Sequence, residues 1–310
     1  MKIYQGIEQF EKLEKAVVTT GTFDGVHIGH RTILNRLIEV AKKMKGESVL
    51  LTFYPHPRMV LQEDAELRLL NTIDEKTQLL EKAGIDHLII HPFTKEFSRT
   101  TSLEFVRDLL VNQIGTKKLV IGYDHHFGRN REGSFEHLKE YGPVYGFEVE
   151  EIPAQDIDDV NVSSTKIRKA LVAGDVKTAN NYLGHNFQLN GVVVHGNKVG
   201  RELGYPTANI DLQNKYKLIP AEGIYAVKVR LKDESYNGML NIGRRPTINS
   251  GNGEVSIEVN IFDFKKEIYG EKIQLELIER IRDEKKFDSK DELIAEMQKD
   301  QVKCERILLH

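Results

Sequence analysis

Two different rhythms of apolar residues divide this chain, and they constrain its fold more than any other feature. In the first half, short apolar runs alternate with longer segments whose apolar residues recur at helical spacing. The expected strands are 16–21, 48–53, 87–91 and 118–122, and the expected helices between them are 31–43, 72–83 and 102–112. Strand–helix alternation of this kind predicts a Rossmann-like parallel sheet covered by helices.

The second half reads as consecutive strands without intervening helices. After two short helices, which begin at Ser164 and end at Gly184, strand-like segments follow at 190–195, 224–231, 236–242, 255–262 and 273–281. Their period-two alternation predicts an antiparallel sheet or small β-barrel. Ser289 and Glu292 form a capping box that predicts a C-terminal helix. We therefore predict two domains, 1–184 and 185–310.

Charge and cysteine content exclude several classes of protein. The net charge of −3 gives no overall basic field, which disfavours nucleic-acid binding through bulk charge. The single cysteine, Cys304, excludes an intrachain disulfide and suits a reducing compartment. The first fourteen residues contain no apolar signal core, and no run approaches the roughly 18 apolar residues of a membrane span. We expect a cytoplasmic protein with no membrane or nucleic-acid partner and no obligatory protein partner.

A glycine- and histidine-rich segment lies where the first strand ends and the first helix begins. The sequence GTFDGVHIGH covers residues 21–30. A helix start offers unpaired N–H groups and partial positive charge, which suit a phosphate. Gly29 would let that phosphate approach the backbone, and His27 and His30 fall on one face of the opening turn. On spacing alone, a glycine turn with two exposed histidines is an equally good interpretation.

Three further segments add candidate contacts. Ser164, Thr165 and Arg168 open a later helix, where they can form a second phosphate cradle or simply cap the helix. The segments FYPHPR (53–58) and GYDHHFGR (122–129) combine aromatic and basic groups after strand ends, either to stack on a planar ring or as structural loops.

Taken together, these motifs resemble the adenylyltransferase half of prokaryotic bifunctional FAD synthetases, which are nucleotidyltransferases with an H-x-G-H signature. The resemblance implies that His27 and His30 contact ATP phosphates and that Ser164, Thr165 and Arg168 close the nucleotide site. It also implies that FMN attacks the ATP α-phosphate and releases pyrophosphate. The remaining residues assigned from it shape the pocket or contact the flavin: Phe23, Asp24, His56, Asp124 and Phe127.

The second half carries its own candidate nucleotide site. Residues 196–209, GNKVGRELGYPTAN, are glycine-rich but lack the ending of a Walker loop. Thr207 and Asn209 are two apart in an extended segment, so both can offer oxygens to a hard cation such as Mg²⁺. Glu258 lies on the polar side of an alternating strand, where it can accept a proton or simply face solvent.

This half resembles a riboflavin kinase through GRELGYPTANI, EGIYAVKV, GMLNIGRRPTI, IEVNIFDF, IYG and IRDEKKF in that order. The resemblance implies that Thr207 and Asn209 bind Mg²⁺-ATP and that Glu258 is the base for the riboflavin 5′-hydroxyl. It places Gly196, Gly200 and Gly204 beside the phosphates, and Arg282 and Phe287 against the flavin. Asn260 departs from the pattern, because we expect histidine there in many members.

Both resemblances together imply one enzyme that phosphorylates riboflavin to FMN and adenylylates FMN to FAD, with ATP and Mg²⁺. Two alternatives stay open on the sequence. One is a riboflavin kinase with a regulatory nucleotide-binding N-terminal domain, and the other is a non-catalytic flavin-binding protein.

Overall fold

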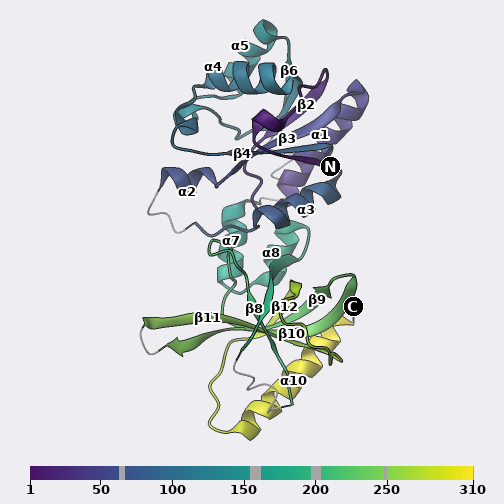
Figure 1. Ribbon diagram of the computed structural model, residues 1–310, viewed down its shortest axis with the longest axis vertical. Helices are drawn as coiled ribbons and strands as arrows, with labels where there is room; N and C mark the ends of the chain where they lie inside the picture. The colour runs from purple at the N-terminus through teal and green to yellow at the C-terminus, as the bar shows by residue number, and fades with distance from the viewer. Residues whose placement is uncertain (63–66, 154–161, 197–203, 248–249, 310) are drawn as a thin grey trace. The chain divides into compact units, whose positions relative to one another are not determined.

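The computed structural model describes residues 1–62, 67–153, 162–196, 204–247 and 250–309, although side chains are described only outside 245–254. The chain divides into two compact units, Met1–Ser163 and Ser164–His310 (Figure 1). Each unit has its own sheet and its own apolar core. Among the described residues, no helix is long and apolar enough to cross a membrane.

The first unit is built on a six-stranded sheet in the order β1-β4-β3-β2-β5-β6, and every neighbouring pair is parallel. This confirms the predicted parallel α/β fold. In chain order the strands are β1 (Lys2–Gln5), β2 (Ala16–Thr20), β3 (Glu47–Tyr54), β4 (His87–Pro92), β5 (Thr116–Gly122) and β6 (Glu148–Ile152).

Helices cover both faces of this sheet (Figure 1). One face packs on α1 (Ile28–Met44) and α3 (Ile73–Ala83). The other packs on α5 (Phe135–Tyr145) and on α4 (Ser102–Glu104), which continues into the π-helical segment η3 (Phe105–Ile114). Because alternate strand residues point to opposite faces, Val17 and Leu50 join one core while Val18 and Leu51 join the other. Short helical segments complete the unit: η1 (Ile7–Gln9), α2 (Pro57–Leu61), η2 (Phe97–Arg99) and η4 (Arg129–Arg131).

The sequence did not lead us to expect β1, β6 and α5. β1 and β6 are the two edge strands of the sheet, and both are four or five residues long with mostly exposed or half-buried side chains. Edge strands of that kind lack the continuous apolar run that marks a buried parallel strand. α5 contains Gly142 and Pro143, two residues that disfavour a helix interior.

The second unit begins with α7 (Ser164–Val172) and α8 (Val176–Leu183) and continues into a closed barrel in the order β10-β11-β8-β7-β12-β9. The barrel strands are all antiparallel to their neighbours, which confirms the predicted barrel. Their bounds are β7 (Phe187–Val194), β8 (Ala208–Asp211), β9 (Gly223–Leu231), β10 (Glu234–Thr247), β11 (Ser250–Ile261) and β12 (Lys272–Arg282).

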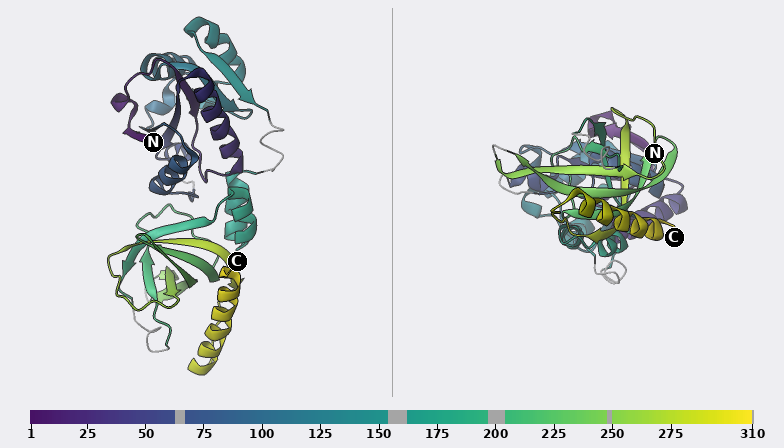
Figure 2. Two further views of the ribbon diagram at one scale, coloured as in Figure 1. Left: turned by 90° about the vertical axis from the view of Figure 1, so that its right-hand side faces the viewer. Right: turned by 90° about the horizontal axis from the view of Figure 1, so that it is seen from below.

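The predicted C-terminal helix is α10 (Lys290–Leu308), with Ser289 as its N-cap (Figure 2). Its buried residues Cys304 and Leu308 pack in one cluster with Ile224, Ala226 and Met239 of the barrel. The helix thus closes an apolar side of the barrel.

The α7–α8 pair belongs to the second compact unit. Asn180 of α8 donates to the carbonyl of Leu277 at 2.8 Å and accepts from the backbone N–H of Phe187 at 2.8 Å. These bonds tie α8 to the barrel strands β12 and β7. The structural division therefore falls before α7, whereas the functional boundary predicted from the sequence, after residue 184, remains a prediction.

Candidate active sites

The loop between β2 and α1 is held in an unusual backbone conformation. Phe23, Gly25 and Val26 have φ values of 46°, 92° and 41°. A positive φ is rare for a β-branched residue such as Val26, so surrounding contacts must maintain it. The carboxylate of Asp24, only 2% exposed, accepts the backbone N–H groups of Leu70 and Asn71 at 3.1 and 3.3 Å. Asp24 thus anchors the loop that presents the histidines.

His27 is the N-cap of α1, at the opening turn where the sequence analysis placed it. Its Nδ1 accepts the backbone N–H of His30 at 3.3 Å. An imidazole that accepts at Nδ1 and is neutral carries its proton on Nε2, so the free nitrogen of His27 is a donor. The two rings stack, with centroids 3.6 Å apart and planes 16° from parallel. The predicted pair therefore exists as one unit at the start of a helix.

The surroundings keep both imidazoles neutral at pH 7. Burial lowers the pKa of His27 to about 4, against a smaller opposing effect of Asp24. Burial, then His27, then the ammonium of Lys76 lower the pKa of His30. The ring of Phe23 lies 4.8 Å from that of His30, and the Nδ1 of His30 is buried without a hydrogen-bond partner among the described residues. A ligand that forms a hydrogen bond with this nitrogen would satisfy a buried polar group.

Gly29 is buried in the first turn of α1, and the close approach of a phosphate to its backbone remains a prediction. Ser164, Thr165 and Arg168 lie in the first turns of α7, in the second compact unit. Their predicted place opposite His27 and His30 therefore remains a prediction.

The predicted flavin contacts of the first unit divide into two kinds. His56 is the N-cap of α2, with Nδ1 accepting from the N–H of Arg58 at 3.2 Å, and Asp124 is exposed beyond the end of β5. Phe127 is instead buried in the core, 5.6 Å from the ring of Phe105. That position gives Phe127 a structural role in holding its loop.

The second unit brings three predicted kinase residues together. Thr207 directly precedes β8, Asn209 lies within β8, and Glu258 lies directly across from Asn209 on β11. The hydroxyl of Thr207 donates to the carboxylate of Glu258 at 3.2 Å. A hydroxyl, an amide and a carboxylate therefore meet at one point of the barrel, from segments about 50 residues apart in sequence.

Gly196 completes this arrangement because it leaves room for Asn209. A Cβ at Gly196 would lie 2.5 Å from Cγ and 2.8 Å from Oδ1 of Asn209, and closer still to Nδ2. Ordinary contacts of a Cβ begin at 3.4 Å. Gly204 has a φ of 82° and open space beside it, and Gly200 lies outside the described residues.

Asn260, the departure from the expected histidine, has a definite place. Its side-chain amide donates to the carbonyl of Pro206 at 2.8 Å, and the residue is buried. The bond fixes the backbone immediately before Thr207. In this chain Asn260 therefore supports the position of Thr207.

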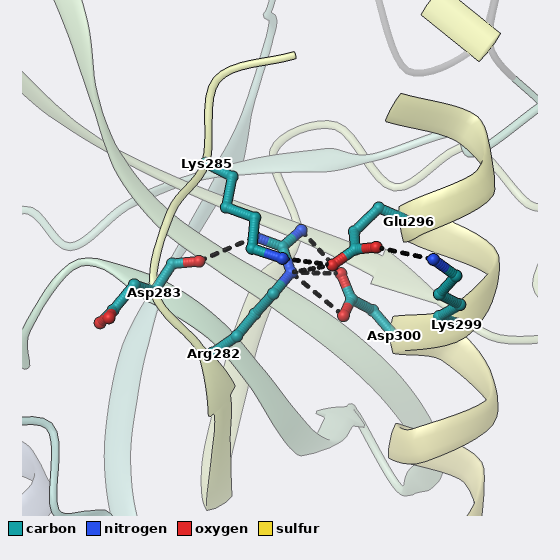
Figure 3. Close-up of polar contacts among 6 residues, drawn as sticks. All are labelled: Arg282, Asp283, Lys285, Glu296, Lys299 and Asp300. Carbon is teal, nitrogen blue, oxygen red and sulfur yellow. Dashed lines mark hydrogen bonds and ion pairs between the residues drawn. The ribbon is translucent and has the colours of Figure 1, made fainter. Parts of the chain in front are cut away.

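Arg282 is engaged in a polar cluster between β12 and α10 (Figure 3). Its Nε donates to both oxygens of Asp300 at 3.1 and 2.9 Å, and its Nη2 lies 2.7 Å from the same carboxylate. Its Nη1 donates to the carbonyl of Asp283 at 2.8 Å. Phe287 lies beside it, 5.8 Å from the guanidinium carbon. Because these bonds use every nitrogen of Arg282, its evident role is to join the strand to the helix, and its flavin contact remains a prediction.

The same cluster continues along α10. Lys285 and Lys299 pair with Glu296 at 2.7 and 3.2 Å and lower its pKa to about 2 (Figure 3). The segment between β12 and α10 is therefore attached to the helix by ion pairs at two successive turns.

The sequence analysis missed Lys76 and His125. Lys76 is buried beneath the histidine loop, and its Nζ donates to the carbonyl of Thr22 at 2.7 Å. His125 meets Thr20 at 3.2 Å between the ends of β5 and β2. A signal for Lys76 was present, since it shares the apolar stripe of its helix with Ile73 and Leu80. His125 had none beyond its place after a strand.

Two family models match the chain, each within one half. The model described as FAD synthetase matches residues 9–166, and the model described as riboflavin kinase matches residues 183–308. With the fold and the two sites above, these matches define an enzyme with two domains that transfers phosphorus-containing groups.

Relatives that match nearly the whole chain carry a joint name. Proteins named bifunctional riboflavin kinase/FMN adenylyltransferase from Haemophilus influenzae, Escherichia coli and Bacillus subtilis are 40%, 36% and 36% identical, over 96–97% of this chain and 93–97% of theirs. The chain belongs to this bifunctional riboflavin kinase/FMN adenylyltransferase family. The membership confirms the predicted combination of the two enzyme halves.

A crystal structure described as a macrolide-efflux protein from Streptococcus pneumoniae is also similar. It superposes with a TM-score of 0.87 at 32% identity, and the match covers 97% of both chains. The fold seen here is therefore shared by a protein that was given a different description.

Proposed function

We propose that the two steps, riboflavin to FMN and FMN to FAD, are performed at the two separate sites described above. The observation that supports this most directly is the meeting of Thr207, Asn209 and Glu258 across β8 and β11, because no requirement of the barrel fold brings a hydroxyl, an amide and a carboxylate together there. His27 and His30 form the corresponding site in the first unit.

In the kinase step, Glu258 accepts the proton of the riboflavin 5′-hydroxyl while that oxygen attacks the γ-phosphorus of ATP, and ADP leaves. Thr207 and Asn209 offer neutral oxygens, and Glu258 a charged one, which is a donor set that Mg²⁺ accepts when waters complete its shell. A bound Mg²⁺ supplies charge neutralisation for the phosphates. The hydrogen bond from Thr207 keeps the carboxylate of Glu258 directed toward the same point.

In the adenylylation step, a phosphate oxygen of FMN attacks the α-phosphorus of ATP, the bond to the β-phosphate breaks, and pyrophosphate leaves. No general base is needed, because the attacking phosphate is already anionic. The Nε2–H of His27 can donate to a phosphate oxygen, and the free N–H groups at the start of α1 add partial positive charge. The contribution of the site is to position the reactants and to stabilise charge.

The test uses the purified protein with riboflavin, ATP and Mg²⁺, and it resolves riboflavin, FMN and FAD by chromatography. Glu258→Gln should stop FMN formation and leave FAD formation from added FMN intact. His27→Ala combined with His30→Ala should do the reverse. Glu234→Gln, at an exposed carboxylate of the same barrel, serves as the control that should change neither step. A folded variant of either site that loses both steps would contradict two separate sites.

The substrates riboflavin, FMN and ATP fit the reactions of the family. The requirement for Mg²⁺, the cytoplasmic location and the expected absence of nucleic-acid and protein partners remain predictions from the sequence.

A further inference from the structure

Lys76 of α3 is a buried cation that the two proposed reactions do not use. The side chain is 6% exposed, and its ammonium donates to the carbonyl of Thr22 at 2.7 Å. Thr22 lies at the start of the loop that leads to His27, and the same carbonyl also accepts the hydroxyl of Thr52 at 3.4 Å. A lysine is almost never fully buried unless its charge is compensated, so this position needs an explanation.

The segment that ends at Lys76 supports the histidine loop at two points. Asp24 binds the N–H groups of Leu70 and Asn71, just before the capping box of α3, and Lys76 binds Thr22 two residues before Asp24. The three positive-φ residues of the loop lie between Thr22 and His27. Both anchors therefore hold the part of the backbone that would relax most readily.

The charged and titratable groups near Lys76 affect one another. Burial lowers the pKa of Lys76 against an opposing effect of Asp24, and the pKa of His30 is lowered by burial, by His27 and by Lys76. A phosphate bound near the ammonium would favour the charged form of Lys76, because a nearby opposite charge raises the pKa of a lysine.

We propose that Lys76 is a positioning residue for the adenylylation step: it fixes the histidine loop through Thr22 and places its ammonium against that loop, so that His27 and His30 receive an ATP phosphate in a preorganised site. This inference depends on the proposed role of His27 and His30. It extends the site from the H-x-G-H signature to a helix about 50 residues later in the chain.

The test compares Lys76→Met, Lys76→Arg and the double variant Asp24→Asn with Lys76→Met. Lys82→Met, at an exposed lysine of the same helix, is the matched control. Each variant is assayed in the full chain for FAD formation from FMN, with kcat and KM for ATP measured between pH 5 and 9. Riboflavin phosphorylation in the same sample is the internal measure of intact protein.

We expect Lys76→Met to lower kcat/KM for FAD formation by about 100-fold, the size of effect seen when one preorganised electrostatic contact or about 1 Å of alignment is lost. Lys76→Arg should recover at least about a tenth of wild-type activity, because it keeps the charge and a donor. Loss of the ammonium should also raise the pKa of His30, so the acid limb of the pH profile should move to higher pH in Lys76→Met.

The double variant separates charge from folding. It removes both buried charges at once and leaves neither unpaired, so it should fold even if Lys76→Met alone is unstable. Because Asp24 is itself an anchor of the loop, the inference is supported if this variant is folded and slower than Asp24→Asn alone. Wild-type rates in the double variant or in Lys76→Met would overturn the inference. A larger loss of activity in Lys76→Arg than in Lys76→Met would also overturn it, because that result is expected if Lys76 only fills space.

The His27→Ala and His30→Ala double variant is run beside these proteins. If it retains FAD formation, the proposed site itself is wrong and the role of Lys76 is lost with it. If it is inactive while Lys76→Met is as active as wild type, only the inference about Lys76 is wrong.

Discussion

Gly196→Ala is a one-methyl change whose effect on the kinase site can be worked out from the structure. The new Cβ would lie 2.5 Å from Cγ of Asn209, whereas ordinary contacts begin at 3.4 Å. Asn209 must therefore move by about 1 Å, and a misplacement of that size in a catalytic group reduces the rate by about 100-fold. This corresponds to about 2.7 kcal/mol in the activation free energy. Gly196 has no positive φ, so backbone strain adds nothing to the expected effect.

The assay measures kcat for FMN formation from riboflavin and for FAD formation from FMN in the same preparation. The first rate should fall by about 100-fold and the second should not change. The free energy of unfolding of the barrel gives a second measure, because overpacking costs about 1–3 kcal/mol. Asn209→Ala removes the side-chain amide with which the new Cβ would clash. Gly196→Ala should therefore have little effect on stability when Asn209→Ala is already present.

Two results would refute this reasoning. One is a wild-type rate of FMN formation in Gly196→Ala, which would mean that Asn209 tolerates displacement. The other is that Gly196→Ala causes an equal loss of stability with and without Asn209→Ala, which would mean that the new methyl group clashes with a different residue.

Three other predictions follow from buried contacts. Asp300→Ala should destabilise the second unit by about 3 kcal/mol in urea unfolding, because it removes the closest carboxylate from the largely buried Arg282 and leaves Glu296 at 3.8 Å, whereas Lys299→Ala at an exposed pair should change it by less than about 1 kcal/mol. The first unit should lose stability as the pH falls from 6.5 toward 4. The pKa of His27 is about 4 in the folded protein and 6.5 in the unfolded chain, so the unfolded chain binds more protons in that window. The loss of stability from His27 alone is on the order of 3 kcal/mol. His27→Gln should reduce that pH dependence without abolishing it, because burial also lowers the pKa of His30 and of His125 in the same unit, and an unchanged slope would contradict the prediction. Gly133→Ala should destabilise the first unit by about 1–3 kcal/mol, because its Cβ would lie 2.6–2.8 Å from the ring of Phe127. It should slow FAD formation and leave FMN formation unchanged. Thermal unfolding and the rates of the two steps check this.

The parts of the fold that follow from local patterns could be predicted from the sequence. Buried strands such as β3 and β4 carry continuous apolar runs, and the barrel strand β11 alternates in period two. The start of α1 was placed too late, because its cap is a histidine and not one of the residues that usually cap helices. β1 and β6 were missed because edge strands have little apolar surface to bury.

The candidate sites show a similar division. The residue types and the short spacings identified His27, His30, Thr207 and Asn209. What the sequence could not supply was register: only the pairing of β8 with β11 shows that Glu258 faces Asn209. The buried partners of Arg282 and Asp24 lie 18 and 46 residues away, so their structural roles depend on tertiary contacts that no local pattern contains.

The closure of the barrel has a consequence for synthesis on the ribosome. β7 is the first strand of the barrel, yet one of its two neighbours is β12, which is made after the other five strands of the barrel. The first unit uses only residues up to 163, so it can fold while translation continues, whereas the barrel of the second unit must wait until β12 has been made. Until then β7 exposes an unpaired edge. Substitutions that delay the pairing of β12 with β7 should therefore cause aggregation of the nascent protein before they cause a measurable loss of activity.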